Sequence, residues 1–272
     1  MPRKRFSELH PLTYAIAVKR LRMKRHVRNL FSRTKYAKDK SEPLPFTVYH
    51  HVALMRHEVG YVDTYLQDNK AVNLSISSKK ISGVIIKPNE TFSFWHLVGN
   101  CTSRKGYMEG LVFAAGKCIT RIGGGMCQFT NLIHWLVLHS PLTLTEHHHH
   151  DGVDMFPDLG RTVPFGCGTS IMYNYLDYRF TNNTVDTFQL MVHTNDTHIC
   201  GELRASARQH FSYEIKEKDA RFVKIGDDYY RKNTVIRETM DKRTGHIINN
   251  EIIRQSHALV MYEINESISA AT

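Results

Sequence analysis

Three consecutive glycines precede a long apolar run that no proline interrupts until Pro141. The run, residues 126–140, is apolar on nearly every side of a helical wheel, which is typical of a helix that is buried all round. Such a helix needs a folded body around it, and a hydrophobic fraction of 42% in 272 residues is enough to build one. The run therefore predicts a globular protein organised around a central helix that starts at a glycine turn.

Cys127 falls in the first turn of this predicted helix. Unpaired N–H groups and the positive end of the helix dipole stabilise a thiolate there, so we expect the pKa of the Cys127 thiol to be lowered. The backbone N–H groups of Cys127 and Gln128, or the Gln128 side-chain amide, would stabilise an oxyanion. Gly124 and Gly125 allow a sharp turn and a close approach of substrate. The alternative is that Cys127 is a small buried side chain without chemistry.

Four consecutive histidines follow the predicted helix in a segment with strand-like alternation. The alternation places His148 and His150 on one side, and a strand that returns from the helix end would bring one of them to Cys127 as a general base. A carboxylate is expected to orient that base. Asp177 is our first choice for this role and Glu146 the second.

The histidine run has two other interpretations, a solvated loop and a metal site. Zinc bound by Cys127 and two histidines is chemically sensible, but no spacing matches a closed zinc site, so we expect no metal or other cofactor. Cys118, Cys167 and Cys200 lack a helix-start context and are expected to be structural. An odd total of five without a C-x-x-C pair suits a reducing compartment. The glycines are not followed by Lys-Ser/Thr, which excludes a phosphate loop.

The positive charge is concentrated at one end of the chain. Residues 1–40 carry thirteen Lys or Arg and two acids, a net charge of +11, whereas the whole chain carries +10. Apolar residues at helical spacing predict an amphipathic cationic helix over about residues 11–37, within a basic arm of residues 1–42. These apolar residues are Leu12, Ile16, Met23, Val27 and Leu30.

The arm has three interpretations. Its apolar stripe docks on the body while its charges face water, or the arm lies on an anionic membrane surface through residues 3–40, or it binds nucleic acid. We expect no nucleic acid partner, because no aromatic and basic residues interleave. No stretch reaches the roughly 20 apolar residues that cross a bilayer, and none forms the apolar core of a signal peptide. We therefore expect a cytoplasmic protein, peripheral at most to the inner membrane face.

Pro43 and Pro45 separate the arm from the rest of the chain. Apolar residues at helical spacing predict a helix over residues 47–70. Two short strands are expected on either side of a turn in which Asn89 takes the left-handed conformation.

The last third of the chain, from Phe188 onward, is rich in Val, Ile, Tyr and Phe and contains a hairpin connection over residues 241–245. The predicted fold class is α+β. A central domain of residues 44–200 packs the helix of the glycine turn on antiparallel strands. Residues 201–272 form an antiparallel β extension.

The chain resembles the VanW family, which is named for an accessory protein of glycopeptide (vancomycin) resistance clusters in bacteria. The resemblance runs from about residue 44 to 200 and rests on several separated motifs in order. These are residues 87–94, 98–99, 105–107, 123–128, Glu146 with His148 and His150, 160–161, and 177–184. Asn89 stands where the family usually has Gly, and Thr162 where many relatives have Asp.

The resemblance implies a role in antibiotic resistance at the cell envelope, on peptidoglycan stem peptides or their precursors. Some envelope-anchored members are described as cysteine-dependent L,D-transpeptidases, which join stem peptides through an acyl-enzyme. By carry-over Cys127 is the nucleophile and His148 or His150 the base. The expected substrate contacts are Gly124, Gly125 and Arg161. We expect thiol acyl transfer or amide hydrolysis; the alternatives are a non-catalytic accessory that binds wall precursor or membrane, and a zinc-dependent hydrolase.

Overall fold

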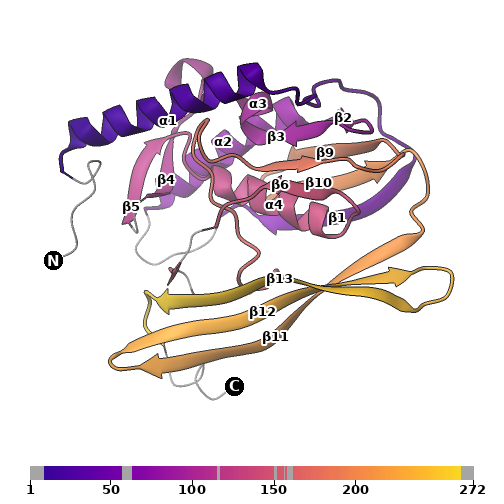
Figure 1. The fold of residues 1–272 in the computed structure, drawn as a ribbon. Coiled ribbons are helices and arrows are strands. Elements are labelled where there is room, and N and C mark those ends of the chain that lie inside the picture. The colour runs from indigo at the N-terminus through magenta and orange to yellow at the C-terminus, as the bar shows by residue number, and fades with distance from the viewer. Residues whose placement is uncertain are drawn as a thin grey trace.

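Helices and antiparallel sheets make up the chain, which confirms the α+β prediction (Figure 1). The structure is a computed structural model and describes residues 9–56, 63–114, 117–149, 152–155, 157 and 162–264. The main body carries helix α1 along one side and a separate, strongly elongated sheet on the other side (Figure 1).

Helix α4 (Met126–Leu138) lies inside the main body, as its apolar sequence predicts, and Phe129, Ile133 and Leu136 are fully buried. It packs on a four-stranded antiparallel sheet. In spatial order the strands are β1 (Phe46–Leu54), β10 (His198–Ala205), β9 (Phe188–Thr194) and β2 (Val84–Ile86). Gly201 of β10 lets the helix approach, because a Cβ there would lie 2.9 Å from a methyl group of Leu136.

The helix predicted over residues 47–70 is wrong in its first part. Residues 46–54 form β1, which pairs antiparallel with β10, and helix α2 starts only at Thr64 and runs to Ile81. Val, Tyr and Phe are frequent in this stretch, and apolar residues four apart fit the period of a strand as well as that of a helix. Pairing with β10 decides between the two. Residues 57–62 lie outside the described part of the chain.

Two smaller sheets flank the central one. β3 (Thr91–Ser93) pairs with β8 (Arg179–Thr181), which pairs with β6 (Thr143–Glu146). β2 and β3 are the two predicted strands, and the turn between them has Asn89 at φ 64°, as expected, but they belong to different sheets.

The remaining elements of the body lead from β3 to the glycine turn. Helix α3 (Phe94–Val98) and the 3-10 helix η2 (Ser103–Lys105) follow β3 directly. They are followed by a hairpin of β4 (Glu109–Ala114) and β5 (Lys117–Ile122). Gly123 follows directly after this hairpin.

The elongated sheet consists of β11 (Phe211–Ile225), β12 (Asp228–Asp241) and β13 (Ile247–Val260), with β7 (Val153–Asp154) parallel to β13. Antiparallel pairing and the hairpin ending at Gly245, with φ 73°, confirm the prediction for this region. Trp135 and Leu138 of α4 pack with Val235 of β12, which attaches the sheet to the body. β10 continues past residue 200, where we placed the domain boundary.

Helix α1 (Pro11–Phe31) forms where the basic arm predicts a helix and ends before residue 37. None of its residues is buried. After it, Ala37 is fully buried, and backbone bridges join Tyr36 to Thr91 and Lys40 to Val84. The arm is therefore fastened to the body. In the part of the chain that the structure describes, no helix is long and apolar enough to span a bilayer.

Candidate functional site

Cys127 is the second residue of α4, so the predicted position in the first turn is confirmed. Gly123 and Gly125 take left-handed conformations, with φ of 76° and 87°, and Gly125 is the N-terminal cap residue. Within the described residues, the backbone N–H of Met126 donates no hydrogen bond, and the N–H of Cys127 faces only its own sulfur. Beside the thiol, the helix therefore starts with two N–H groups that donate to no other described residue.

The three glycines are required by close packing inside the protein. A Cβ on Gly124 would lie 2.1 Å from the backbone of Gly110 in β4, and one on Gly125 would lie 2.3 Å from Cγ of Lys70 in α2. The Asn73 amide donates to the carbonyl of Gly124 at 3.0 Å and is itself fully buried. The groups that approach these glycines closely are thus protein groups, whereas we expected substrate.

The Cys127 thiol does not have the lowered pKa that we expected. The residue is half-buried, and burial raises the pKa of the thiol above its ordinary value. The N–H groups of Ile171 and of Cys127 itself act in the opposite direction but do not outweigh burial. Desolvation of the charged form explains why the helix dipole alone is not decisive. At neutral pH the thiol is protonated and needs a base to become a nucleophile.

Both donors expected of Gln128 are engaged elsewhere. Its backbone N–H donates to the carbonyl of Gly125 at 3.1 Å. Its side-chain Nε2 donates to the carbonyl of Leu54 at the end of β1. The oxyanion donors that the structure leaves available are therefore the N–H groups of Cys127 and Met126, and Gln128 ties the helix start to β1.

A short segment, residues 168–171, contacts both Cys127 and the histidine run. On the helix side, the Thr169 hydroxyl lies 3.4 Å from the Cys127 carbonyl oxygen and the Ile171 N–H faces the Cys127 sulfur. On the histidine side, the Ser170 N–H donates to the carbonyl of His148 at 2.7 Å. Segment 168–171 therefore lies between the histidine run and the start of α4 and contacts both.

His148 faces Glu146. Its Nε2 lies 3.0 Å from Oε1 of Glu146, and in the described part of the chain no hydrogen bond joins an imidazole to the Cys127 sulfur. The same carboxylate accepts hydrogen bonds from Arg25 and from the backbone N–H of Asp177. Burial alone would raise the pKa of Glu146, but the hydrogen bonds from His148 and Arg25 outweigh it and lower the pKa to about 2. An ionised Glu146 thus orients His148.

The carboxylate of Asp177, our first choice for that role, accepts hydrogen bonds only from groups that stabilise the fold. Oδ1 accepts hydrogen bonds from the N–H groups of Trp95 at 3.0 Å and Tyr178 at 2.9 Å. Oδ2 accepts from the Ser93 hydroxyl and from Nε of Arg179 at 2.7 Å. These four bonds fill the acceptor positions of a carboxylate. Asp177 therefore joins α3 to β8, and we withdraw it as the orienting carboxylate.

His147 and His149 form a half-buried cluster of tilted rings with His134. The His147 ring lies 4.2 Å from that of His134 on α4 and 4.0 Å from that of His149. His147 and His149 both donate to the carbonyl of Gly168, which confirms that they share one side. Burial lowers the pKa of His147 to about 3, so this ring is neutral. Among the described residues, no three His, Cys, Asp or Glu side chains are placed to share a metal ion. His150 and Arg161 lie outside the described residues.

Two further residues at this site were not predicted from the sequence. Arg25 reaches from the basic helix to Glu146. Lys70 lies half-buried against Gly125 and has no hydrogen-bond partner within the described residues. Burial, followed by the positive charge of Arg56, lowers the pKa of Lys70 to about 8. An isolated Lys in a helix looks like a surface residue, and an Arg in a basic arm looks solvated, so only the tertiary structure identifies them.

Comparisons with known proteins agree with these motifs. A family model described as VanW like protein matches residues 69–204. The Vancomycin B-type resistance protein VanW of Enterococcus faecalis is 34% identical over 216 residues, which cover 79% of this chain and 78% of that protein. The Uncharacterized protein YoaR of Bacillus subtilis is 31% identical over 127 residues, 45% of this chain and 39% of that protein. No solved structure matches significantly. The glycine turn, Cys127 and the histidine run all lie inside the matched region, and the chain belongs to the VanW family.

Proposed function

We propose that this chain acts in vancomycin resistance through the thiol of Cys127, by acyl transfer or amide hydrolysis on peptidoglycan-type peptides. The resistance role is supported by the name of the Enterococcus faecalis relative, which the chain covers over 78% of its length. The chemistry is supported by one observation. Cys127 stands at the start of a buried helix beside two backbone N–H groups, its own and that of Met126, which donate to no other residue in the described part of the chain.

The reaction follows from that placement. A base takes the thiol proton, the sulfur attacks a peptide carbonyl carbon, and the oxyanion is stabilised by the N–H groups of Met126 and Cys127. The carbon–nitrogen bond then breaks, the amine leaves with a proton, and a thioester remains on Cys127. An incoming amine completes a transfer, and water completes a hydrolysis.

A histidine of the run, His148 or His150, is the proposed base. Support comes from segment 168–171, which contacts the Cys127 sulfur through Ile171 and the histidine run through Ser170. Glu146 supplies the carboxylate that orients the His148 ring. The contribution of each ring is tested by comparing H148Q with H150Q, since Gln keeps a polar side chain but cannot accept the proton.

An assay with a synthetic stem peptide tests the proposal. C127A and C127S lose product formation by at least 100-fold while keeping the melting temperature of the parent, and C118A, which removes an exposed cysteine, keeps full activity. Full activity in C127A contradicts thiol chemistry.

A non-catalytic accessory is the second candidate. The raised pKa of the Cys127 thiol favours it, because a buried protonated thiol is unreactive. In that case C127A still binds a stem peptide in calorimetry and still supports resistance in cells. A C127A protein that binds peptide but no longer supports resistance favours the enzyme.

A further inference from the structure

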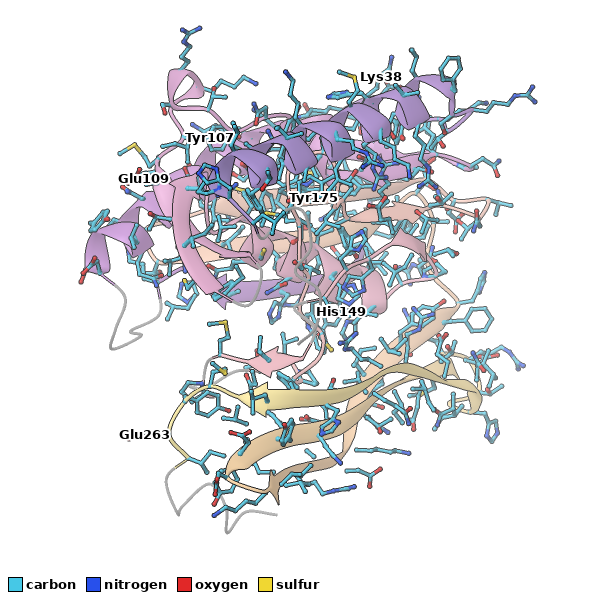
Figure 2. All side chains as sticks on the ribbon, turned by 60° about the vertical axis from the view of Figure 1, so that its left-hand side comes forward. Lys38, Tyr107, Glu109, His149, Tyr175 and Glu263 are labelled. Atoms are coloured by element: carbon cyan, nitrogen blue, oxygen red, sulfur yellow. The ribbon has the colours of Figure 1, made fainter. Side chains whose placement is uncertain are left out.

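Helix α1 contacts the body through polar side chains. Nε of Arg22 donates to the carbonyl of Tyr173 at 3.2 Å, and Arg25 donates to Glu146 and to the carbonyl of Tyr175, which lies beneath the helix in Figure 2. Asn29 accepts a hydrogen bond from Arg179 at 3.2 Å. The face that docks is therefore the one with charges and amides. This is the reverse of the docked arrangement that the sequence suggested, in which the apolar stripe meets the body.

The apolar stripe faces outward instead. Its side chains are 47% to 80% exposed: Leu12 63%, Ile16 51%, Met23 58%, Val27 47% and Leu30 80%. At 3.6 residues per turn these positions fall within an arc of about 60°, on the side of the helix away from Arg22, Arg25 and Asn29. A row of exposed apolar side chains with this regularity marks an interaction surface, because single exposed residues are common but aligned ones are not.

Cations border the stripe from Lys19 onward. Lys19 lies at one edge of the stripe and Arg20 at the other, with Lys24 and Arg28 further round the helix on the Arg20 side, and all four are exposed. α1 contains no Asp or Glu. Further exposed cations, Arg33, Lys35 and Lys38, follow the helix, and Figure 2 shows Lys38 at the same outer side of the molecule.

We propose that the outer face of α1 lies on an anionic lipid bilayer. Exposed apolar side chains enter the headgroup and acyl boundary, while flanking Lys and Arg pair with lipid phosphates, which is the pattern of an interfacial helix. A nucleic acid would satisfy the cations but would leave the apolar stripe in water. Lipid therefore fits this face of α1 better than nucleic acid does. Contact with lipid does not depend on the chemistry of Cys127.

Contact of α1 with lipid determines how the rest of the molecule is oriented. The elongated sheet of β11 to β13 lies on the side of the body away from α1, so it points away from the lipid (Figure 1). Arg25 ties the membrane-facing helix to Glu146, and Glu146 holds His148. Glu146 and His148 are thus held directly behind the lipid-binding helix.

Vesicle co-sedimentation of the full chain tests the proposal. The probe is phosphatidylcholine vesicles with about one third phosphatidylglycerol, compared with pure phosphatidylcholine. Each cation near the surface strengthens binding about fivefold, so the variant K19Q/R20Q/K24Q/R28Q binds at least 100-fold more weakly. The matched control K218Q/R221Q/K242Q/R243Q removes the same charge from exposed positions of the elongated sheet and keeps the parent affinity.

A second variant separates lipid from nucleic acid. I16Q/M23Q/V27Q keeps every charge and every contact to the body, so its melting temperature is unchanged and its vesicle binding falls about tenfold or more. Equal loss in the two charge variants, or parent-like vesicle binding in the apolar variant, overturns the proposal. Binding of a short DNA duplex that is as tight as vesicle binding and indifferent to the apolar variant overturns it in favour of nucleic acid.

Discussion

The guanidinium of Arg25 holds both carboxylate oxygens of Glu146, with Nη1 2.6 Å from Oε2. The two side chains are only 11% and 14% exposed. A bidentate pair of this kind is geometrically specific, and low exposure makes it stronger than a surface ion pair. It joins the basic arm to the end of β6, directly before the histidine run. Nothing in the sequence indicates that these two parts of the chain are in contact.

Loss of the Glu146 carboxylate is expected to destabilise the protein. E146Q removes the charge that Arg25 and His148 share, and we expect the free energy of unfolding to fall by roughly 2 kcal/mol in urea denaturation. D68N is the matched control, because Asp68 pairs with Arg56 at an exposed position; it should change stability by less than about 0.5 kcal/mol. Equal effects of the two variants would contradict a structural role for the pair.

The same variant has a pH signature. The pKa of Glu146 is lowered from 4.5 to about 2 in the folded state, so its contribution to stability is complete above pH 4.5 and is lost as the pH falls toward 2. The stability difference between parent and E146Q therefore shrinks over that window. A difference that is constant from pH 6 to pH 2 is the result that this reasoning does not allow.

His147 gives a pH dependence in a higher window. Burial lowers its pKa from 6.5 to about 3, so the folded protein holds a neutral ring that the unfolded chain protonates below pH 6.5. The stability of the parent therefore falls between pH 6.5 and pH 3. In H147Q the Gln amide can still donate to Gly168, and the fall should be shallower. Urea unfolding at pH 8, 6 and 4 measures both slopes; identical slopes speak against a buried neutral His147.

The glycine turn should tolerate no side chain at its centre. A Cβ at Gly124 would lie 2.1 Å from the backbone of Gly110, which cannot move independently of β4. We expect G124A to cost about 3 kcal/mol of unfolding free energy. Gly168 is the control, because a Cβ there would meet nothing within 4 Å, and G168A should be nearly neutral. Parent-like stability of G124A would show that the turn is looser than described.

Lys70 is expected to contact the substrate. Its pKa of about 8 keeps most of the ammonium protonated at neutral pH, and it has no hydrogen-bond partner within the described residues. Stem peptides carry carboxylates that such a cation attracts. We expect K70M to raise KM at least tenfold with little change in kcat, and K70R to recover part of the loss. An unchanged KM in K70M assigns the side chain to packing against Gly125.

The elements that the sequence predicted well are those with strong local patterns. The apolar run gave the position of α4 and of Cys127, and the Val- and Ile-rich segments with Gly245 gave the hairpin of β12 and β13. In both cases the local sequence determines the type of secondary structure and the position of the adjoining turn. β1 was missed, because apolar residues four apart fit a helix and a strand equally, and pairing with the distant β10 decided the outcome.

The site was harder to predict, since charges and contacts come from distant parts of the chain. The expectation of a lowered Cys127 pKa considered the helix dipole and not the desolvation by packed neighbours. Asp177 and Glu146 cannot be ranked by sequence, because only the fold shows which carboxylate is already filled with backbone N–H groups. Which face of α1 contacts the body could not be predicted for the same reason. Both faces of the helix carry polar and apolar side chains, and the partner of Arg25 is 121 residues away in the sequence.

The most direct test of the account is the mass of the intact protein during turnover of a stem peptide, quenched in acid. We predict an adduct with the mass of the acyl fragment, mapped to the peptide that contains Cys127 and absent from C127A. Product formation without that adduct, or an adduct that persists in C127A, would contradict a thioester at the start of α4.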